Sequence, residues 1–420
     1  MALARAFMQL SPIITALRRH KVATLLIVLQ VALTLAVASN ALFIAATRVV
    51  HLSRPTGTDE AHTFIIRNGW TMGQNATQIN ANINADLETL RHVAGVRDAF
   101  SSQGFPLGGY NADLITHIKL EPDQKADAQV APYFASDEHT IHTFGISLIA
   151  GRNFRPDEIA GIGPNDKMAP PDIIITHSLA DKLFPDGSAL GKTVYLPDGP
   201  TAIIGIVASL QSSLCSLWNR DDALDGYTVL VPMHYLDPAG VVYLVRTDTT
   251  AMQPVITAAL KALRERSGAR IINPKKDVFT MAYVRKRAYA DDHSVAMLMS
   301  ILSALLLLAT AGGIVGLSSF WVSQRRRQIG IRRSLGATAG DILRYFHAEN
   351  FLIVSGGVAL GALLAFLANL GLMQFYELPR IPPYTPLLGA LVLWLLGQLA
   401  VWGPARSAAK VPPVVAIRTE

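Results

Sequence analysis

The stretch that decides the arrangement of this chain is QRRRQIGIRRSLGATAGDILRYFHAEN, residues 324–350. It is basic and polar, and a long uncharged apolar segment lies on each side of it. Gly336 interrupts it, and Thr338 followed three residues later by Asp341 has the spacing of a capping box, in which a hydroxyl and a carboxylate satisfy free backbone N–H groups at a helix start. The pattern predicts a helix, a glycine stop and a second helix, held at the cytoplasmic face of a membrane.

The composition places part of the chain in lipid. Of its 420 residues 50% are hydrophobic and only 16% are charged, whereas soluble proteins have about a quarter charged residues. The mean hydropathy is +0.31 and the formal net charge is +6. The arginines are not interleaved with stacking aromatic residues, so the basic balance indicates a membrane surface and no nucleic-acid partner. The single Cys215 can form neither an intrachain disulfide nor a zinc site.

Four uncharged apolar segments predict four transmembrane helices. The first follows a basic leader and is too long for the apolar part of a signal peptide, about 7–15 residues, although Ala36-Val37-Ala38 resembles a cleavage site. It exceeds the ~20 residues that cross a bilayer, so we expect an uncleaved helix. The predicted segments are leader 1–21, span 22–47, outer domain 48–292, span 293–322, loop 323–350, span 351–375, link 376–383, span 384–403 and tail 404–420.

Lysine and arginine predict the topology. The leader, the 324–350 loop and the tail are basic, whereas the link 376–383 contains only Arg380. Because positively charged loops stay in the cytoplasm, we expect both termini and the arginine-rich loop on the cytoplasmic side of the membrane. The large domain between the first and second spans is then extracytoplasmic, and long domains translocate largely regardless of charge.

The outer domain has an α+β pattern. Its apolar residues alternate over short runs and recur at helical spacing over longer ones. We expect the units at about 60–125 and 226–275 to pair, with about 130–225 as an inserted lobe, and a helix over 275–292 that is either a stalk or an ordinary connector. Predicted strands are 62–67, 114–120, 173–175, 194–196, 201–207 and 241–246; predicted helices are 77–93, 178–184 and 252–266.

The motifs that could mark a binding site, a metal site or a helix contact are weak signals. Gly187-Ser-Ala-Leu-Gly191-Lys192-Thr193 is one residue short of a phosphate-binding loop, so a turn before a strand is expected. His139 and His142, beside Asp137 and Glu138, could be metal ligands but lack a third placed ligand, and solvated polar side chains are the expected reading. Gly312 with Gly316 and Gly357 with Gly361 have GxxxG spacing, which indicates either close helix packing or loosely packed small residues.

The sequence Arg325–Thr338 resembles the R-x-x-E-I-G-I-R-R-A-L-G-A signature of MacB/FtsX-type ABC transporter permeases. Residues 404–418, PARSAAKVPPVVAIR, resemble that family's ending, and Leu17–Lys21 its start. Weaker likenesses are Gly151–Phe154 and Val245–Thr247 in the outer domain. The matches run in order along the whole chain, with one span before the outer domain and three after it.

The resemblance implies a multi-pass permease of the bacterial inner membrane that is not itself catalytic and binds no cofactor, with ATP and magnesium on a separate ATPase subunit. It implies a dimer of like or unlike permeases, movement of the outer domain (mechanotransmission), and efflux of peptide, antibiotic or toxin or handling of lipoprotein or lipid. The resemblance leaves open whether a periplasmic adaptor and an outer-membrane duct also belong to the transporter. The residues expected to contact the ATPase are Arg325, Arg327, Gln328, Gly330, Arg332, Arg333, Gly336, Ala337, Thr338 and Asp341.

One residue departs from the signature, and two other functions compete with transport. Gln328 stands where the family has glutamate, which either reshapes the ATPase contact or is harmless because glutamine keeps the size and much of the hydrogen bonding. A membrane sensor would place a signalling domain inside, and the inner segments are too short to fold alone. A membrane-anchored enzyme lacks a recognisable catalytic constellation.

Overall fold

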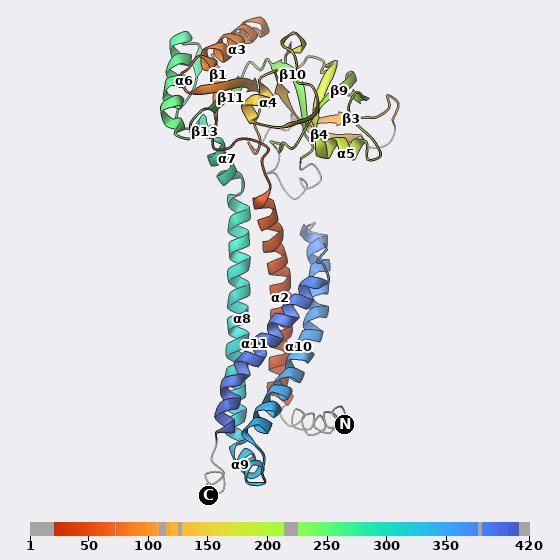
Figure 1. Cartoon of the computed structure of the whole chain (residues 1–420), viewed down its shortest axis with the longest axis vertical. Helices are drawn as coiled ribbons and strands as arrows, with labels where there is room; N and C mark the ends of the chain where they lie inside the picture. The colour runs from red at the N-terminus through yellow and green to blue at the C-terminus, as the bar shows by residue number, and fades with distance from the viewer. Residues whose placement is uncertain are drawn as a thin grey trace. The chain divides into compact units, whose positions relative to one another are not determined.

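The structure is a computed structural model that describes residues 21–71, 73–108, 115–124, 128–213, 226–376 and 380–410 (Figure 1). It consists of two compact units. We call Met1–Leu52 with Asp292–Glu420 the helical unit, and Ser53–Asp291 the α+β unit. The α+β unit is thus inserted in the sequence after the first long helix, as predicted.

Four helices among the described residues are long and apolar enough to cross a membrane. They extend past the predicted spans, because those spans were limited by charged residues and a charge does not end a helix. The largest difference concerns α10, which runs without a break from the 323–350 loop through the whole third span. The helices of this unit are α2 (Lys21–Ser53), α8 (Ala290–Gln324), α9 (Arg326–Ser334), α10 (Ala339–Tyr376) and α11 (Tyr384–Ala409).

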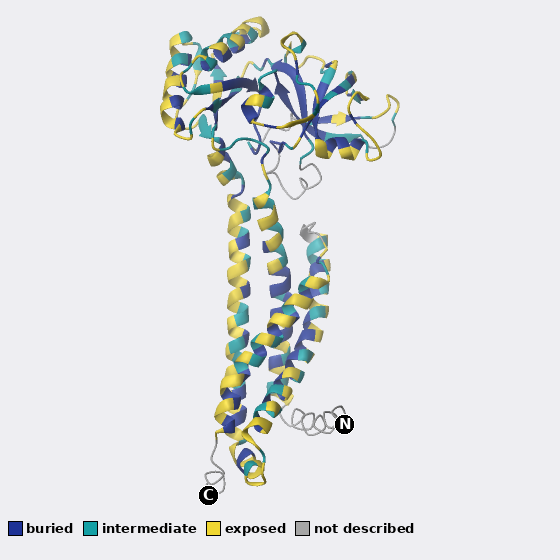
Figure 2. Cartoon of the chain, viewed as in Figure 1, coloured by how far each residue is buried: buried dark blue, intermediate teal, exposed yellow. Residues whose placement is uncertain are grey.

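The first helix lies in the core of the helical unit. Val31 and Leu35 of α2 are almost fully buried against apolar side chains of α8, α10 and α11. The hydroxyls of Thr34 and Thr310 lie 2.7 Å apart and join α2 to α8, and Asn40 donates to the carbonyl oxygen of Ala365 on α10. The outward faces of the helices are exposed (Figure 2), as expected of surfaces that meet lipid.

The two GxxxG pairs have different surroundings. A Cβ atom at Gly357 would lie 2.6 Å from Val31 Cβ, and one at Gly361 would lie 2.8 Å from the Ala32 carbonyl oxygen. These two glycines therefore let the backbones of α10 and α2 approach closely. A Cβ atom at Gly312 or Gly316 would meet nothing within 4 Å among the described atoms of the chain.

The first sheet of the α+β unit joins distant parts of the sequence. Its strand order is β12-β1-β11-β2, with β13 also paired to β1. Two helices, α3 and α6, pack on one face of this sheet through a core that includes Phe64, Ile83 and Leu263. Its elements are β1 (Thr63–Trp70), α3 (Ala76–Arg91), β2 (Val96–Ser102), β11 (Gly240–Thr247), α6 (Met252–Arg266), β12 (Arg270–Ile271), β13 (Val278–Thr280) and α7 (Met281–Ala288).

A fully buried carboxylate fixes α3 to its neighbours. Asp86 of α3 accepts from Arg270 Nη2 at 2.9 Å and from the Tyr243 hydroxyl at 2.6 Å, and it also pairs with Arg266. Asp86 is 0% exposed and Arg270 is 3% exposed at the side chain. The two predicted βα units at the ends of this domain are therefore joined by the ion pairs of Asp86 as well as by strand pairing in the sheet.

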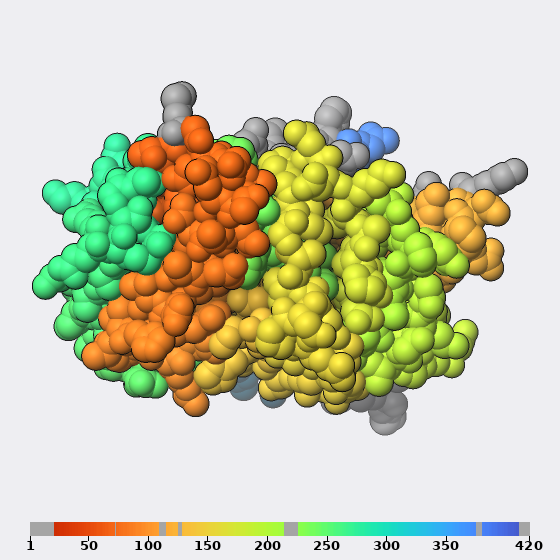
Figure 3. Space-filling model, turned by 90° about the horizontal axis from the view of Figure 1, so that it is seen from above, coloured from red at the N-terminus to blue at the C-terminus, as the bar shows by residue number. Residues whose placement is uncertain are grey.

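The second sheet has eight strands in the order β3-β4-β10-β7-β9-β5, with β6 paired to β10 and β8 paired to β9. The predicted hairpin around residues 197–199 is present as the antiparallel pair β8–β9. Figure 3 shows α3 and α6 gathered at one end of the unit and the β5–β9 segment at the other. The strands of the second sheet and the helices between them are β3 (Ile115–Ile118), β4 (Gln129–Ser136), α4 (Thr140–Phe144), β5 (Leu148–Gly151), η1 (Pro156–Glu158), β6 (Ala160–Ile162), β7 (Asp172–Thr176), α5 (His177–Leu183), β8 (Thr193–Leu196), β9 (Gly199–Val207) and β10 (Val229–Tyr235).

Two sequence predictions for this unit are corrected. The lobe boundaries were wrong, because β3 and β10 lie outside the predicted inserted lobe of 130–225 and yet pair with β4 inside it. The prediction of a continuous helix over residues 275–292 was also wrong. Val278 and Phe279 pair with Ile66 and Ile65 of β1 as a short strand, and the helix begins only after Thr280, whose hydroxyl accepts from the Tyr283 N–H. Sheet pairing therefore overrides local helical spacing here.

Candidate functional site

The basic stretch folds into two helices joined at a glycine, which we call the α9–α10 elbow (residues 325–349). Helix α9 ends at Ser334, and Gly336 follows it with a φ of +98°, a left-handed value that glycine adopts without strain. The Ala337 N–H bonds back to the Arg332 carbonyl oxygen at 3.1 Å, as in a Schellman motif. The predicted capping box is present, since Thr338 N donates to Asp341 Oδ2 at 3.0 Å and Asp341 N donates to Thr338 Oγ1 at 3.2 Å.

An ion pair and an aromatic contact hold the two helices of the elbow together. Arg325 donates to both carboxylate oxygens of Glu349, each at 3.0 Å. The side chains of Arg325 and Glu349 are only 11% and 2% exposed, so this pair is shielded from water. Arg332 lies over the Tyr345 ring with its Cζ 5.0 Å from the ring centroid, a cation–π contact.

Apolar side chains join the elbow to the end of α11. Ile329 of α9 is 5% exposed and belongs to one cluster with Ile342 and Phe346 of α10. Ala405 and Ala408 of α11 complete that cluster. The elbow is therefore packed on the long helices α10 and α11.

The outer face of the elbow combines exposed apolar and basic side chains. Leu335 is 82% exposed and Ile331 is 46% exposed, beside exposed Arg326, Arg327 and Gln328. A leucine so exposed on an arginine-rich tip leaves an apolar surface without a partner within the described chain. We call these five residues the elbow face.

The predicted contact residues separate into two groups. Arg327, Gln328 and Arg332 are exposed, whereas Arg325 is engaged by Glu349 and Gly330 is buried. Gly336, Ala337, Thr338 and Asp341 form the turn and the cap, and Arg333 is half-buried beside them. Sequence reasoning missed Leu335 and Ile331 as surface residues and Glu349 as the anchor. The position of Leu335 directly before the glycine stop was the available signal.

Two other predicted sites have structural explanations. Gly187–Thr193 is a turn that leads into β8, as expected. In the part of the chain that the structure describes, no group of three or more His, Cys, Asp or Glu side chains is arranged to hold a metal ion. His139 and His142 instead both bind the carboxylate of Asp98, with His139 Nδ1 2.8 Å from one oxygen and His142 Nδ1 2.6 Å from the other.

The weaker motifs of the α+β unit contain structural arginines. Arg152 donates to both oxygens of Glu158, at 2.7 and 2.9 Å. Arg246 donates to Asp59 Oδ2 at 2.8 Å and to the His142 carbonyl oxygen at 2.8 Å. Both arginines therefore join separate segments of this unit. Most of the Leu17–Lys21 motif and residues 411–418 of the ending lie outside the described residues.

These features define a multi-pass membrane protein with an α+β domain inserted between its first and second long helices. Residues 25–263, more than half of the chain, match the family model of the MacB-like periplasmic core domain, and residues 300–413 match the FtsX-like permease C-terminal model. The chain therefore belongs to the MacB/FtsX-type family of ABC transporter permeases.

Two curated sequence relatives agree with this membership. The chain is 26% identical over 290 residues to the macrolide export ATP-binding/permease protein MacB of Chromobacterium violaceum, covering 66% of this chain and 41% of that protein. It is 30% identical over 270 residues to the protein of the same name from Shewanella oneidensis, covering 59% and 38%. The chain thus spans about two fifths of the length of these curated relatives. The periplasmic region of MacB from Actinobacillus actinomycetemcomitans aligns with 56% of this chain and 97% of that structure, at 13% identity and a TM-score of 0.34.

Proposed function

We propose that this chain is the permease subunit of an ABC transporter and that it converts ATP hydrolysis on a separate ATPase subunit into movement of its α+β unit. The ATPase binds ATP and magnesium, and this chain binds no cofactor and catalyses no reaction. The elbow and both termini lie in the cytoplasm, and the α+β unit lies outside the inner membrane. A second permease completes the transporter, with a periplasmic adaptor and outer-membrane duct as further components in the efflux form of the proposal.

The observation that supports the proposal most strongly is the elbow face. An exposed leucine and isoleucine surrounded by arginines suit a partner with an apolar groove and an acidic rim. The Arg325–Glu349 pair and the apolar cluster around Ile329 join that face to α10 and α11. Pushing or pulling on the elbow face is therefore transmitted to the transmembrane helices with little local yielding.

The substrate class follows only from the family. The relatives' name refers to macrolide export, and the family resemblance extends to efflux of peptides, antibiotics or toxins and to handling of lipoproteins or lipids. We propose one of these roles for this chain, with cargo recognised outside the elbow.

The test is co-purification of an ATPase from native membranes, followed by coupled ATPase measurements on elbow variants. We expect Leu335→Asp and Arg327→Glu to lose the bound ATPase or its stimulation, because each places a negative charge on the elbow face. The matched control is Leu335→Met, which keeps an apolar side chain and should retain the complex. Full coupled activity in both charged variants, with the complex intact, would contradict the proposal.

A further inference from the structure

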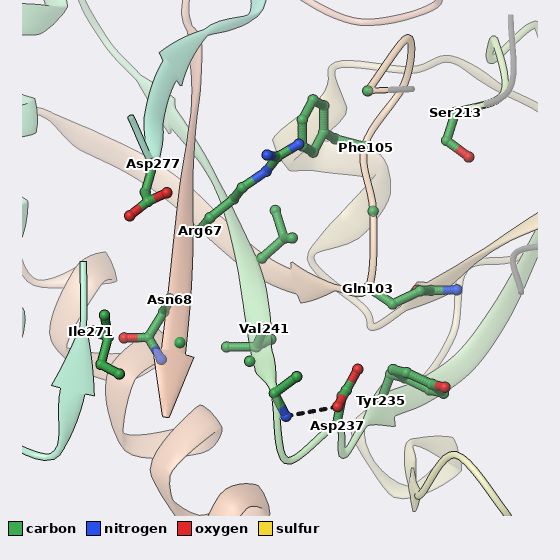
Figure 4. Close-up of a pocket in the computed structure, with 16 residues that line it drawn as sticks. Arg67, Asn68, Gln103, Phe105, Ser213, Tyr235, Asp237, Val241, Ile271 and Asp277 are labelled. Carbon is green, nitrogen blue, oxygen red and sulfur yellow. Dashed lines mark hydrogen bonds between the residues drawn. The ribbon is translucent and has the colours of Figure 1, made fainter. Parts of the chain in front are cut away.

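A cavity of about 520 Å³ lies entirely within the α+β unit, on the first sheet (Figure 4). Small-molecule sites typically measure about 300–1,000 Å³, so this volume suits a small organic ligand. Its lining comes from β1 and β11, from the residues that follow β2, from the β10–β11 turn and from β12. The elbow face lies in the other unit, so none of its residues belong to this cavity.

The register of two strands explains why the cavity exists. Arg67 lies opposite Val242, and Gly69 lies opposite Gly240, so these four residues share one face of the sheet. Two opposed glycines leave the floor without side chains. A Cβ atom at Gly240 would lie 2.3 Å from the Asn68 carbonyl oxygen, whereas one at Gly69 would lie 3.4 Å from its nearest neighbour. Gly69 is therefore a position where a side chain could fill the cavity without a severe backbone clash.

Arg67 supplies an unmatched positive charge in the lining. Its Cζ lies 5.2 Å from the ring centroids of both Phe105 and Phe279. Among the described residues its guanidinium makes neither a hydrogen bond nor an ion pair within 4.0 Å, and Arg67 is exposed, so its five N–H donors are open to solvent and to a ligand. Burial lowers the pKa of Arg67, with the carboxylate of Asp277 opposing that shift. The aromatic contacts hold the side chain while they leave its hydrogen-bonding groups available to a ligand.

Two acids also line the cavity, but each already has a backbone partner. Asp237 Oδ1 accepts the Ala239 N–H at 2.7 Å, a bond drawn in Figure 4. Asp277 Oδ2 accepts the Asn273 N–H at 2.7 Å. Each carboxylate thus already accepts a backbone N–H, whereas the guanidinium of Arg67 faces only aromatic rings and the charge of Asp277, which lies beyond ion-pair distance. This difference in hydrogen bonding, and not the net charge of the lining, favours a ligand that accepts N–H groups from Arg67.

We propose that this cavity binds a small organic carboxylate. The carboxylate oxygens accept the N–H groups of Arg67, and the apolar body of the ligand lies over the Gly69–Gly240 floor beside Phe105 and Val242. A planar guanidinium matches a carboxylate in geometry and forms two parallel hydrogen bonds with it. The inference does not depend on the transport function proposed above.

The test is isothermal titration calorimetry on the full chain in detergent with three probes of one size, namely benzoate, benzamide and benzylamine. We expect benzoate to bind best and benzamide to bind at least about tenfold more weakly, since hydrogen bonds to charged groups are the stronger ones. Stronger binding of benzylamine would assign the cavity to cations and overturn the proposal. So would the absence of benzoate binding at tens-of-millimolar concentration, roughly the weakest affinity worth calling a site.

Three variants locate the binding. Arg67→Gln should weaken benzoate about tenfold or more. Gly69→Val should also block binding, because its side chain occupies the floor while Arg67 stays in place. Arg97→Gln, which removes an exposed arginine elsewhere in this unit, is the control and should bind benzoate normally. Thermal unfolding identifies any variant that fails to fold. Unchanged benzoate affinity in folded Arg67→Gln, or in folded Gly69→Val, would overturn the proposal.

Discussion

The α+β unit and the helical unit are stabilised by different interactions. In the α+β unit a fully buried carboxylate, Asp86, is surrounded by two arginines and a tyrosine. In the described part of the helical unit, ion pairs near helix ends include Arg48–Asp292 and Arg325–Glu349. The middle of the bundle relies on close backbone contact at Gly357 and Gly361. The α+β unit is therefore sensitive to loss of charge. The helical unit is sensitive to gain of volume, because ions are expensive in lipid and its helices pack by close contact instead.

The largest effect should come from removing the buried charge of the α+β unit. Asp86→Asn leaves Arg266 and Arg270 without their anion, and breaking a buried pair costs about 3–5 kcal/mol. We expect a large drop in the unfolding free energy, measured by hydrogen exchange of α3 peptides in the full chain. The control Asp181→Asn removes a 67% exposed carboxylate and should change little. Equal protection in both variants would show that the network is not a main source of stability.

A gain of volume should give the next largest effect, in the helical unit. Gly361→Val places side-chain atoms against the Ala32 backbone of α2, and overpacking costs about 1–3 kcal/mol. We expect a lower unfolding temperature by differential scanning fluorimetry in detergent. Gly371→Val on the same helix is the matched control, because a Cβ atom there meets nothing within 4 Å among the described residues. If the two variants unfold alike, the α2–α10 contact is looser than described.

A moderate effect of pH on the stability of the α+β unit is expected. The hydrogen bond to Asp98 raises the pKa of His139, against an opposing effect of burial. Burial raises the pKa of Asp137 to about 6, against an opposing effect of Arg91. Burial would raise the pKa of Asp98, but hydrogen bonds from His139 and His142 outweigh it and lower that pKa.

The sign of the pH effect follows from these shifts. His139 contributes stability that is fully present below its unfolded pKa of about 6.5 and is lost as pH rises through its folded pKa. Asp137 likewise binds its proton more tightly when folded, so its burial costs stability as pH rises from about 4 to 6. We expect His139 and Asp137 to raise the unfolding temperature of this unit at pH 5.5 relative to pH 8, against buried His234, whose lowered pKa acts in the opposite sense. His139→Gln should flatten the profile, His177→Gln should not, and identical profiles would contradict the assignment.

The smallest effect on stability should come from a substitution in the Gly312–Gly316 pair. Gly312→Ala adds a methyl group where the chain itself offers no contact within 4 Å, so we expect a change within about 0.5 kcal/mol. The informative measurement is the fraction of dimer by crosslinking in native membranes. A weakened dimer at unchanged stability would place Gly312 at the contact with a second permease, whereas an unchanged dimer would remove it from that contact.

Local sequence patterns predicted many elements well. The predicted helix 252–266 has the bounds of α6, and the predicted pair of strands around residues 197–199 is β8–β9. The elbow was also readable, because a glycine stop and a capping box act over three or four residues. The strands β2, β4 and β10 were not predicted. Their residues are buried on both faces or interrupted by proline, so simple alternation was weak.

The sites were less accessible to sequence reasoning. The five arginines clustered at the start of the 324–350 stretch looked equivalent, and only the fold assigns Arg325 to Glu349, 24 residues away. His139 and His142 appeared as possible metal ligands because Asp98, which satisfies both, lies about 40 residues earlier. The cavity at Arg67 depends on the register of β1 with β11, which are separated by most of the α+β unit.

The sequence by itself determined the four apolar helices, the inserted α+β domain, the helix–glycine–helix elbow and the family. Each of these depends on composition, on a short-range repeat or on a motif a few residues long. Only the tertiary structure decided which glycines contact another helix, which arginine is buried, which surface of the elbow is free and where the sheet is hollow. These features depend on atoms far apart in the chain, and pairing between distant segments is set by packing and register, which a local pattern does not specify.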